Sequence, residues 1–268
     1  MVELTLETLR LAQVAAGVLV ATLNRPDRLN SMTRTMFHEL ETLGAALNAD
    51  RETRVLIITG AGAAFCAGYD LEDAEEIGEM TAMDFLDLQE SAARALSGLR
   101  SLRIPVIAAV NGAAAGGGLS LSLAADIRLA GESAKFNAAF VRIGLSAGDL
   151  GASWLLPRII GPGPAAEIAF TGRIVSAAEA ARLGLVNRVV PDDELLAESV
   201  SLAEAIAKNS PAGIRMSKRA LQANMEVSSY DAALELENRG QTLLTRGEDM
   251  REALTAFKEK RPARFTGR

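Results

Sequence analysis

Three short segments carry the residue types that could do chemistry in this chain: residues 63–71, 110–120 and 144–157. Each lies where a strand ends, which is where α/β proteins place their ligands. The second segment contains Gly116-Gly117-Gly118 and enters a predicted helix. The start of a helix favours negative charge, but glycines also occur where a helix packs closely on a strand, so the triplet alone leaves both interpretations open. Together the segments predict a small-molecule site.

The elements that must position these segments alternate between amphipathic helices and buried strands. Apolar residues at helical spacing are followed by short β-branched runs, and this unit recurs along the chain. Such alternation predicts an α/β protein. The predicted helices span residues 33–48, 84–102 and 119–125, and the predicted strands span residues 18–23, 55–60, 105–110 and 127–130.

Beyond Pro191 the character of the sequence changes. Residues 194–209, 213–225 and 229–246 have helical patterns, and no further buried strand follows. We therefore expect two regions, a core over residues 1–195 that holds the site and a helical region over residues 196–268.

The composition narrows the classes of partner. A formal net charge of −6 at pH 7 argues against a nucleic-acid surface, which needs clustered Lys and Arg. Cys66 is the only cysteine, so disulfides within the chain and multi-cysteine metal sites are excluded and a reducing compartment is expected. Residues 1–10 lack the pattern of a secretory signal, and no apolar stretch of about 18 residues is present. We expect a cytoplasmic protein with no membrane or nucleic-acid partner.

The three segments, taken in order, resemble the enoyl-CoA hydratase/isomerase (crotonase) family over nearly the whole chain. The Gly-x-Gly-x-x-Gly spacing of a dinucleotide site is absent, which argues against a Rossmann enzyme. The matching motifs are Asn24-Arg25-Pro26 with Asn30, Phe65-x-Ala67-Gly68-x-Asp70-Leu71, residues 105–112 with the glycine triplet, Thr171-Gly172-Arg173, residues 180–190, and Ala256-Phe257 with Lys260-Arg261.

This resemblance implies a spiral of repeated ββα units with a helical C-terminal region that builds a homotrimer or a hexamer. It also implies that the backbone N–H groups of Tyr69 and Gly117 form an oxyanion hole for the carbonyl oxygen of an acyl-CoA thioester. Coenzyme A enters as part of the substrate, and no separate cofactor or metal is expected. The residues that the resemblance places along coenzyme A are Arg25, Asp27, Arg28, Leu29, Ala67, Tyr69, Asp70 and Leu71, with Phe257 and Lys260 from a neighbouring subunit.

Several of these residues have a second interpretation. Arg25 and Arg28 suit phosphate groups, but solvated surface arginines are equally compatible with the sequence. Phe257 and Lys260 are explained equally well by the packing of a helix end. Asp70 precedes an acidic segment, where capping of a helix and a solvated face are the alternatives to a functional role.

The chain departs from the family pattern at the two glutamates with which hydratases move protons. Ser120 and Phe140 stand at these positions, and neither side chain is a carboxylate base. Because general acid or base catalysis contributes a factor of about 10² to 10⁴ for each group, a conventional hydratase without both should be crippled.

Asp149 is the carboxylate that remains in the right region, and several isomerases of the superfamily use an aspartate in this loop. A single desolvated carboxylate suffices to remove a proton and return it elsewhere, which is what double-bond isomerisation requires. The alternative is that Asp149 caps the helix that begins near Gly151. His38 and Cys66 are predicted to be structural.

Three functions stay open on the sequence alone. Our preferred prediction is an isomerase with an oxyanion hole at Tyr69 and Gly117 and with Asp149 as proton shuttle. The alternatives are an enoyl-CoA hydratase of fatty-acid degradation and a protein that binds acyl-CoA without catalysis.

Overall fold

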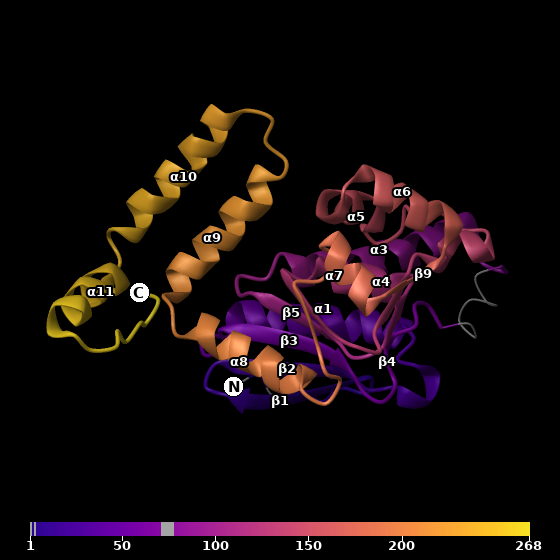
Figure 1. Cartoon of the computed structure of the whole chain (residues 1–268), viewed down its shortest axis with the longest axis horizontal. Coiled ribbons are helices and arrows are strands. Elements are labelled where there is room, and N and C mark those ends of the chain that lie inside the picture. Colours follow the sequence, from indigo (N-terminus) through magenta and orange to yellow (C-terminus); the bar gives the residue numbers. More distant parts are fainter. Residues whose placement is uncertain (1, 3, 71–77) are drawn as a thin grey trace.

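The computed structural model of the chain describes residue 2, residues 4–70 and residues 78–268. In this part of the chain the strands form two sheets (Figure 1). The larger sheet has the order β1 (Leu9–Ala15), β2 (Val18–Leu23), β3 (Val55–Gly60), β5 (Val106–Val110), β7 (Ile127–Gly131) and β10 (Arg188–Val190). The smaller sheet has the order β4 (Ala64–Cys66), β6 (Ala113–Ala115), β8 (Lys135–Asn137) and β9 (Ile174–Ser176).

Each successive turn of the chain contributes one strand to the larger sheet and the next strand to the smaller sheet. β3 is followed by β4, β5 by β6 and β7 by β8, and β3, β5 and β7 pair in parallel, as do β4, β6 and β8. Each pair leads into a helical segment, so the predicted spiral of ββα units is confirmed. The helices are α1 (Arg34–Ala49), α3 (Ala82–Arg100), α4 (Gly117–Ala124), α5 (Ala152–Ile160), α6 (Pro162–Thr171), α7 (Ala177–Leu183), α8 (Leu195–Ala207), α9 (Pro211–Asn224), α10 (Tyr230–Leu244) and α11 (Glu248–Glu259), with short 3-10 helices η1 (Pro26–Arg28) and η2 (Ala139–Ile143).

The larger sheet is buried on both faces, which explains why its central strands are continuous apolar runs. In β3, Val55 and Ile57 belong to one apolar cluster, to which α8 contributes Leu195 and Ala203. Leu56 and Ile58 point to the opposite face and join the main core with residues of α1 and α3. Successive side chains of β3 therefore pack alternately into the two apolar clusters on opposite faces of the sheet.

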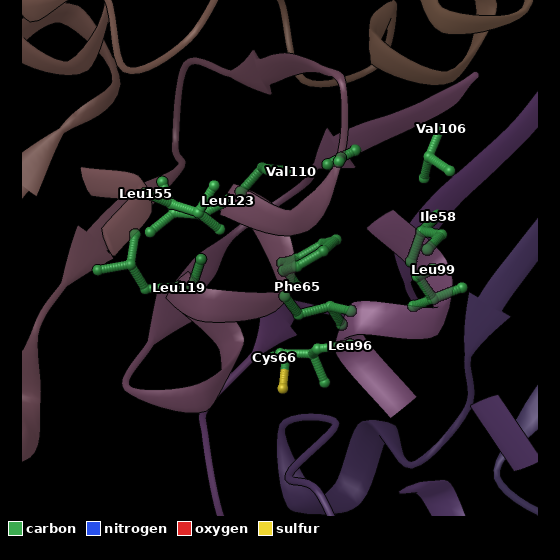
Figure 2. Close-up of a cluster of buried hydrophobic side chains, with 14 of the residues drawn as sticks. Ile58, Phe65, Cys66, Leu96, Leu99, Val106, Val110, Leu119, Leu123 and Leu155 are labelled. Atoms are coloured by element: carbon green, nitrogen blue, oxygen red, sulfur yellow. The ribbon is translucent and has the colours of Figure 1, made fainter. Parts of the chain in front are cut away.

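The main core packs against the end of β4 and the start of α4. Phe65 and Cys66 of β4 are fully buried, and Leu96 of α3 and Leu119 of α4 belong to the same cluster. Figure 2 shows these side chains gathered between the sheets and the helices. Dense packing there fixes the backbone of both elements, which is what a site made of backbone amides requires.

The C-terminal helices α9 to α11 project from the body that contains the sheets (Figure 1). The Nζ of Lys218 in α9 donates to Asp126 Oδ2 at 2.7 Å and to the Ile104 carbonyl oxygen at 2.9 Å, and this largely buried ion pair ties the tail to the core. The sequence patterns predicted a helix over 229–246 in a helical tail, and the structure has α10 there, followed by the further helix α11. Among the described residues no helix is both long and apolar enough to span a bilayer. The division of the chain at residue 195 stays a prediction.

Candidate active site

Two backbone segments meet where β4 and β6 end. β4 and β6 pair in parallel, and each of these two segments then turns at a glycine with positive φ, Gly68 at 101° and Gly116 at 51°. A Cβ atom added to Gly68 would lie 3.5 Å from the Gly117 nitrogen and 2.9 Å from the Ala115 carbonyl oxygen. Only glycine fits such a close approach at such a φ.

The amides of Tyr69 and Gly117 follow these two glycines directly. Met32 and Tyr69 form an isolated parallel β-bridge: the Met32 N–H donates to the Gly68 carbonyl oxygen at 2.7 Å, and the Asp70 N–H donates to the Met32 carbonyl oxygen at 2.9 Å. In a parallel bridge the N–H of the middle residue faces the other edge, here the edge that carries β6. Gly117 is the first residue of α4, where an N–H has no partner within the helix. Neither amide donates to an acceptor in the described part of the chain.

The glycine triplet packs tightly on the end of β4. A Cβ atom on Gly118 would lie 2.0 Å from the Cys66 carbonyl oxygen, so this position accepts only glycine. A Cβ atom on Gly117 would meet the sulfur of Met32 at 3.1 Å and Leu150 Cδ1 at 3.5 Å. The close-packing interpretation of the triplet is therefore confirmed at Gly118, while its role as a site for negative charge stays a prediction.

Asp149 lies next to this junction, in the loop that precedes α5. Its side chain is partly buried, and burial raises its pKa from the ordinary value of 3.8 to about 6, although hydrogen bonds from the Gln89 side chain and the Leu150 N–H oppose the rise. The capping alternative is wrong, since Gly151 is the N-cap of α5 and no side chain caps this helix. The Asp149 carboxylate therefore does not cap α5, and its role as a base stays a prediction.

Ser120 holds the backbone at Asp149. Its hydroxyl, fully buried in α4, donates to the Asp149 carbonyl oxygen at 3.2 Å. Leu150 then takes a left-handed conformation with φ at 47°, which is uncommon outside glycine. At position 120, where the resemblance predicts the place of a hydratase glutamate, the structure therefore has a serine that anchors the loop carrying Asp149.

Phe140 stands at the other position where the resemblance predicts a hydratase glutamate. Its ring is buried, with Cε1 3.7 Å from the place where a Cβ atom of Gly116 would stand. Ser120 and Phe140 thus both lie beside the glycine triplet, and neither side chain is a carboxylate.

The side chain of Tyr69 joins the two halves of the site. Its hydroxyl donates to Gln89 Oε1 at 3.3 Å, and its ring packs edge-on against Phe37 with centroids 5.5 Å apart. Burial, and then the negative charge of Asp149, raise the pKa of the Tyr69 hydroxyl well above its ordinary value. The structure therefore brings Tyr69, Gly117 and Asp149 together.

Gln89 is the residue that sequence reasoning missed. It lies in the amphipathic helix α3 beside the buried residues Leu88 and Ala92 and is itself half-buried. A long polar side chain at the border of an apolar helix face was the available signal, but such residues are common on amphipathic helices.

The segments predicted to follow coenzyme A are held together by backbone hydrogen bonds. The Ala67 N–H donates to the Leu29 carbonyl oxygen at 3.0 Å, and Asp27, Arg28 and Leu29 are exposed in and after η1. Leu71 lies outside the described residues.

Arg25 has a structural partner. Its Nη1 donates to Asp70 Oδ2 at 2.7 Å and to the Ser31 carbonyl oxygen at 2.7 Å. Asp70 is buried and also accepts from the Ser31 hydroxyl at 2.8 Å. The guanidinium of Arg25 and the carboxylate of Asp70 therefore brace the loop that carries Tyr69.

Phe257 and Lys260 lie apart from this site within one chain. Both belong to the end of α11, on the tail that projects from the body (Figure 1), and the Phe257 side chain is 85% exposed. His38 is exposed on α1, and the described residues contain no cluster of His, Cys, Asp and Glu that could hold a metal ion. Burial raises the pKa of the Cys66 thiol to about 12, which keeps it protonated.

In this ββα spiral two neighbouring strands of the smaller sheet, β4 and β6, lead to the free amides of Tyr69 and Gly117, an arrangement that suits stabilisation of an oxyanion. The sequence profile described as enoyl-CoA hydratase/isomerase matches residues 13–268. The chain belongs to this family, and it is an enzyme of the family, whose members act on acyl-CoA thioesters.

Individual relatives cover nearly the whole chain. A probable enoyl-CoA hydratase of Mycobacterium tuberculosis is 44% identical over 255 residues, 91% of this chain and 88% of the relative. The 1,2-epoxyphenylacetyl-CoA isomerase of Escherichia coli is 39% identical over 259 residues, 96% of this chain and 98% of the relative. The crystal structure of a putative enoyl-CoA hydratase from Streptomyces coelicolor A3(2) superposes with a TM-score of 0.94 at 36% identity, covering 100% of this chain and 97% of that one.

Proposed function

We propose that this enzyme shifts a double bond within an acyl-CoA thioester, with Asp149 as the proton shuttle. The observation that carries the proposal is the partly buried Asp149 carboxylate beside the Tyr69–Gly117 junction, while Ser120 and Phe140 stand where a hydratase needs glutamates. The E. coli relative named 1,2-epoxyphenylacetyl-CoA isomerase supports isomerisation of an acyl-CoA in general, although its named substrate is an epoxide.

The mechanism needs no water. The thioester carbonyl oxygen accepts hydrogen bonds from the Tyr69 and Gly117 N–H groups, and such a donor contributes about 2.7 to 4 kcal/mol once the oxygen becomes an enolate. Asp149 removes a proton from the carbon α or γ to the carbonyl, and the electron pair delocalises onto the oxygen. Protonated Asp149 then returns the proton at the other end of the conjugated system.

The state of Asp149 suits both halves of this cycle. With a pKa of about 6, the carboxylate is about nine-tenths ionised at pH 7 and accepts a proton more readily than an ordinary aspartate. A base whose pKa lies close to the working pH also gives its proton back easily.

The experiment compares the wild type, Asp149→Asn and the exposed control Asp87→Asn with 3-enoyl and 2-enoyl thioesters, following the absorbance of the conjugated product. The expected result is isomerisation by the wild type and the control, and a loss of about 10² to 10⁴ in kcat for Asp149→Asn with binding retained. Hydration of 2-enoyl thioesters at equal rates by all three proteins would establish the hydratase instead. Binding without turnover by the wild type would establish a non-catalytic acyl-CoA-binding protein.

We further propose that the chain forms a homotrimer or a dimer of trimers through its tail. Large apolar side chains of α9 to α11 are left exposed in one chain, among them Leu221 at 72%, Leu243 at 67% and Phe257 at 85%. Burial of such a surface is the main driving force of stable assembly. Phe257 and Lys260 would then reach the coenzyme A of a neighbouring subunit. Sedimentation of a monomer at micromolar concentration would contradict this assembly.

A further inference from the structure

Four arginines from three separate segments line one pocket at the junction between the tail and the body. They are Arg51 after α1, Arg103 before β5, and Arg215 and Arg219 one turn apart on α9. The pocket has a volume of about 320 Å³, and Lys218, already paired with a carboxylate, adds a fifth cationic side chain to its wall. Among the described residues that line it none is an Asp or a Glu, although the whole chain has a net charge of −6. We call it the arginine pocket.

These arginines have few partners within the chain. The Nε atom of Arg215 is buried and makes no hydrogen bond to the described residues. The ion pairs formed within the described part of the chain include none of Arg51, Arg215 and Arg219. Arg103 Nε donates only weakly, to the Leu47 carbonyl oxygen at 3.4 Å. A buried N–H without an acceptor costs free energy, and oxygen atoms of a ligand would remove that cost.

The positive charges also act on one another. Burial lowers the pKa of Arg103, and the neighbouring charges of Arg51 and Arg215 lower it further. Asp50 is the carboxylate that opposes this effect, but its oxygens already accept hydrogen bonds from two backbone N–H groups of the following loop, at 3.0 and 3.1 Å. Because like charges held together in a half-buried place repel one another, an anion bound among them gains more than it would at an open surface.

The chemistry of the pocket favours phosphate. A guanidinium group offers two parallel N–H donors that match two phosphate oxygens, which an ammonium group does not. Asn48, Ser101 and Gln222 also line the pocket and bring uncharged polar groups. A phosphate monoester carries about −1.5 to −2 at pH 7, so two phosphate groups are needed to balance four arginines.

A second and larger pocket adjoins the first. It has a volume of about 560 Å³, shares the same four arginines, and is lined also by the apolar side chains of Ile104, Met250 and Phe265. Small-molecule sites usually combine a few polar groups with apolar walls in this way. The remainder of a phosphorylated molecule therefore has room beside its phosphate groups.

The arginine pocket is separate from the candidate active site. Arg51 and Arg103 precede β3 and β5, whereas the chain continues from the carboxyl ends of these parallel strands to the two amides of the active site. The two sites therefore lie toward opposite ends of the strands. Arg215 and Arg219 belong to the tail, so an anion in the pocket contacts both the tail and the body.

We propose that the arginine pocket binds the diphosphate group of a small molecule, at a site distinct from the one for the acyl-CoA thioester, and that the bound anion links the tail to the body.

The test titrates the wild type with inorganic diphosphate in a calorimeter at constant ionic strength. The variants are Arg103→Gln and Arg215→Gln, and Arg239→Gln, at an exposed position on α10, is the matched control. A titration with succinate asks whether phosphate is required. A titration in the presence of saturating butyryl-CoA asks whether diphosphate occupies the acyl-CoA site. Thermal unfolding and sedimentation of each protein report on folding and assembly.

The expected result is one diphosphate bound per chain, with a dissociation constant raised about 10-fold or more in Arg103→Gln and in Arg215→Gln and unchanged in Arg239→Gln. Binding should persist with butyryl-CoA present and should be weaker for succinate. Diphosphate should also raise the melting temperature of the wild type, because a ligand that binds only the folded state stabilises it, and the rise should be smaller in the two pocket variants.

The proposal is overturned if the wild type does not bind diphosphate, or if all four proteins bind it equally. Loss of binding with butyryl-CoA would place diphosphate in the acyl-CoA site, and equal affinity for succinate would refute the preference for phosphate. If the wild type does not bind and Arg215→Gln forms a smaller assembly than the wild type, the arginines contact a carboxylate of a neighbouring copy instead. If Arg215→Gln does not fold, Arg103→Gln and Arg219→Gln decide by the same criterion.

Discussion

Asp149 should cost the folded protein stability at neutral pH, so that Asp149→Asn gives a more stable but inactive protein. Burial is the first cause of its raised pKa, which moves from 3.8 to about 6. At about 1.4 kcal/mol per unit this corresponds to about 3 kcal/mol, and the remaining contact with solvent reduces the expected value to about 1–2 kcal/mol.

The sign follows from comparing the folded and unfolded states. The folded pKa lies above the unfolded one, so between pH 4 and pH 6 the unfolded chain has released the proton of Asp149 while the folded chain still holds it. The stability of the wild type relative to the asparagine variant is therefore highest below about pH 4, falls as the pH rises through about 6, and is constant above it.

The assay is urea unfolding of the wild type, Asp149→Asn and Asp87→Asn at pH 5, 6 and 8. The advantage of Asp149→Asn should grow from pH 5 to pH 8, whereas Asp87→Asn, at an exposed position on α3, should stay close to the wild type throughout. An Asp149→Asn protein no more stable than the wild type at pH 8 would refute the argument that a desolvated, ionised carboxylate is maintained here at the expense of stability.

Three further predictions concern the frame of the site. Gly118→Ala should destabilise the fold by about 3 kcal/mol, because the added Cβ atom would meet a backbone carbonyl. Gly117→Ala should cost about 1 kcal/mol of stability but lower kcat, because its Cβ atom would displace flexible side chains beside the amide. Thermal unfolding measures the loss of stability in each variant, and turnover measures the loss of kcat. Asn30→Ala should cost about 2–4 kcal/mol in urea unfolding, since its buried amide makes three hydrogen bonds at 2.8–2.9 Å. Lys218→Met should cost about 2–3 kcal/mol and make the tail more sensitive to protease, because it leaves a carboxylate unpaired.

Each of these has a clear contrary result. Equal stability of the two alanine variants would mean that the backbone at the glycine triplet yields more than its packing suggests. A mild Asn30→Ala phenotype would mean that water replaces the lost bonds. Arg239→Ala removes an exposed ion pair of α10 and should change stability by less than about 0.5 kcal/mol. If Lys218→Met loses no more stability than Arg239→Ala, the buried ion pair of Lys218 with Asp126 does not tie the tail to the core.

The long elements of the fold were predictable because their patterns are local. The helix predicted over 33–48 is α1, with Met36, Phe37 and Leu40 buried, and the strand predicted over 55–60 is β3. The four strands of the smaller sheet were not predicted from periodicity. Each has three residues, too few for alternation to show, and Ala113–Ala115 has no β-branched side chain.

The site divides in the same way. The residues that the family resemblance supplied, Tyr69, Gly117 and Asp149, do come together in space. Gln89 could not be found from sequence, because its contact is with the Tyr69 hydroxyl, 20 residues away, and no pattern in the chain links the two residues. The partner of Arg25, the buried Asp70, was likewise invisible at a separation of 45 residues.

The anchoring of the aspartate loop by Ser120 limits how this enzyme could be converted to water addition. A glutamate at position 120 would set its carboxylate against the Asp149 carbonyl oxygen, two acceptors with no donor between them, in a space that now holds a fully buried hydroxyl. A glutamate at position 140 would replace a buried ring and leave both a void and a charge. Neither substitution is compatible with the present loop, so an evolutionary or engineered route between the two chemistries must rebuild residues 144–151 together with both positions, and single steps along it are expected to lose the old activity before the new one arises.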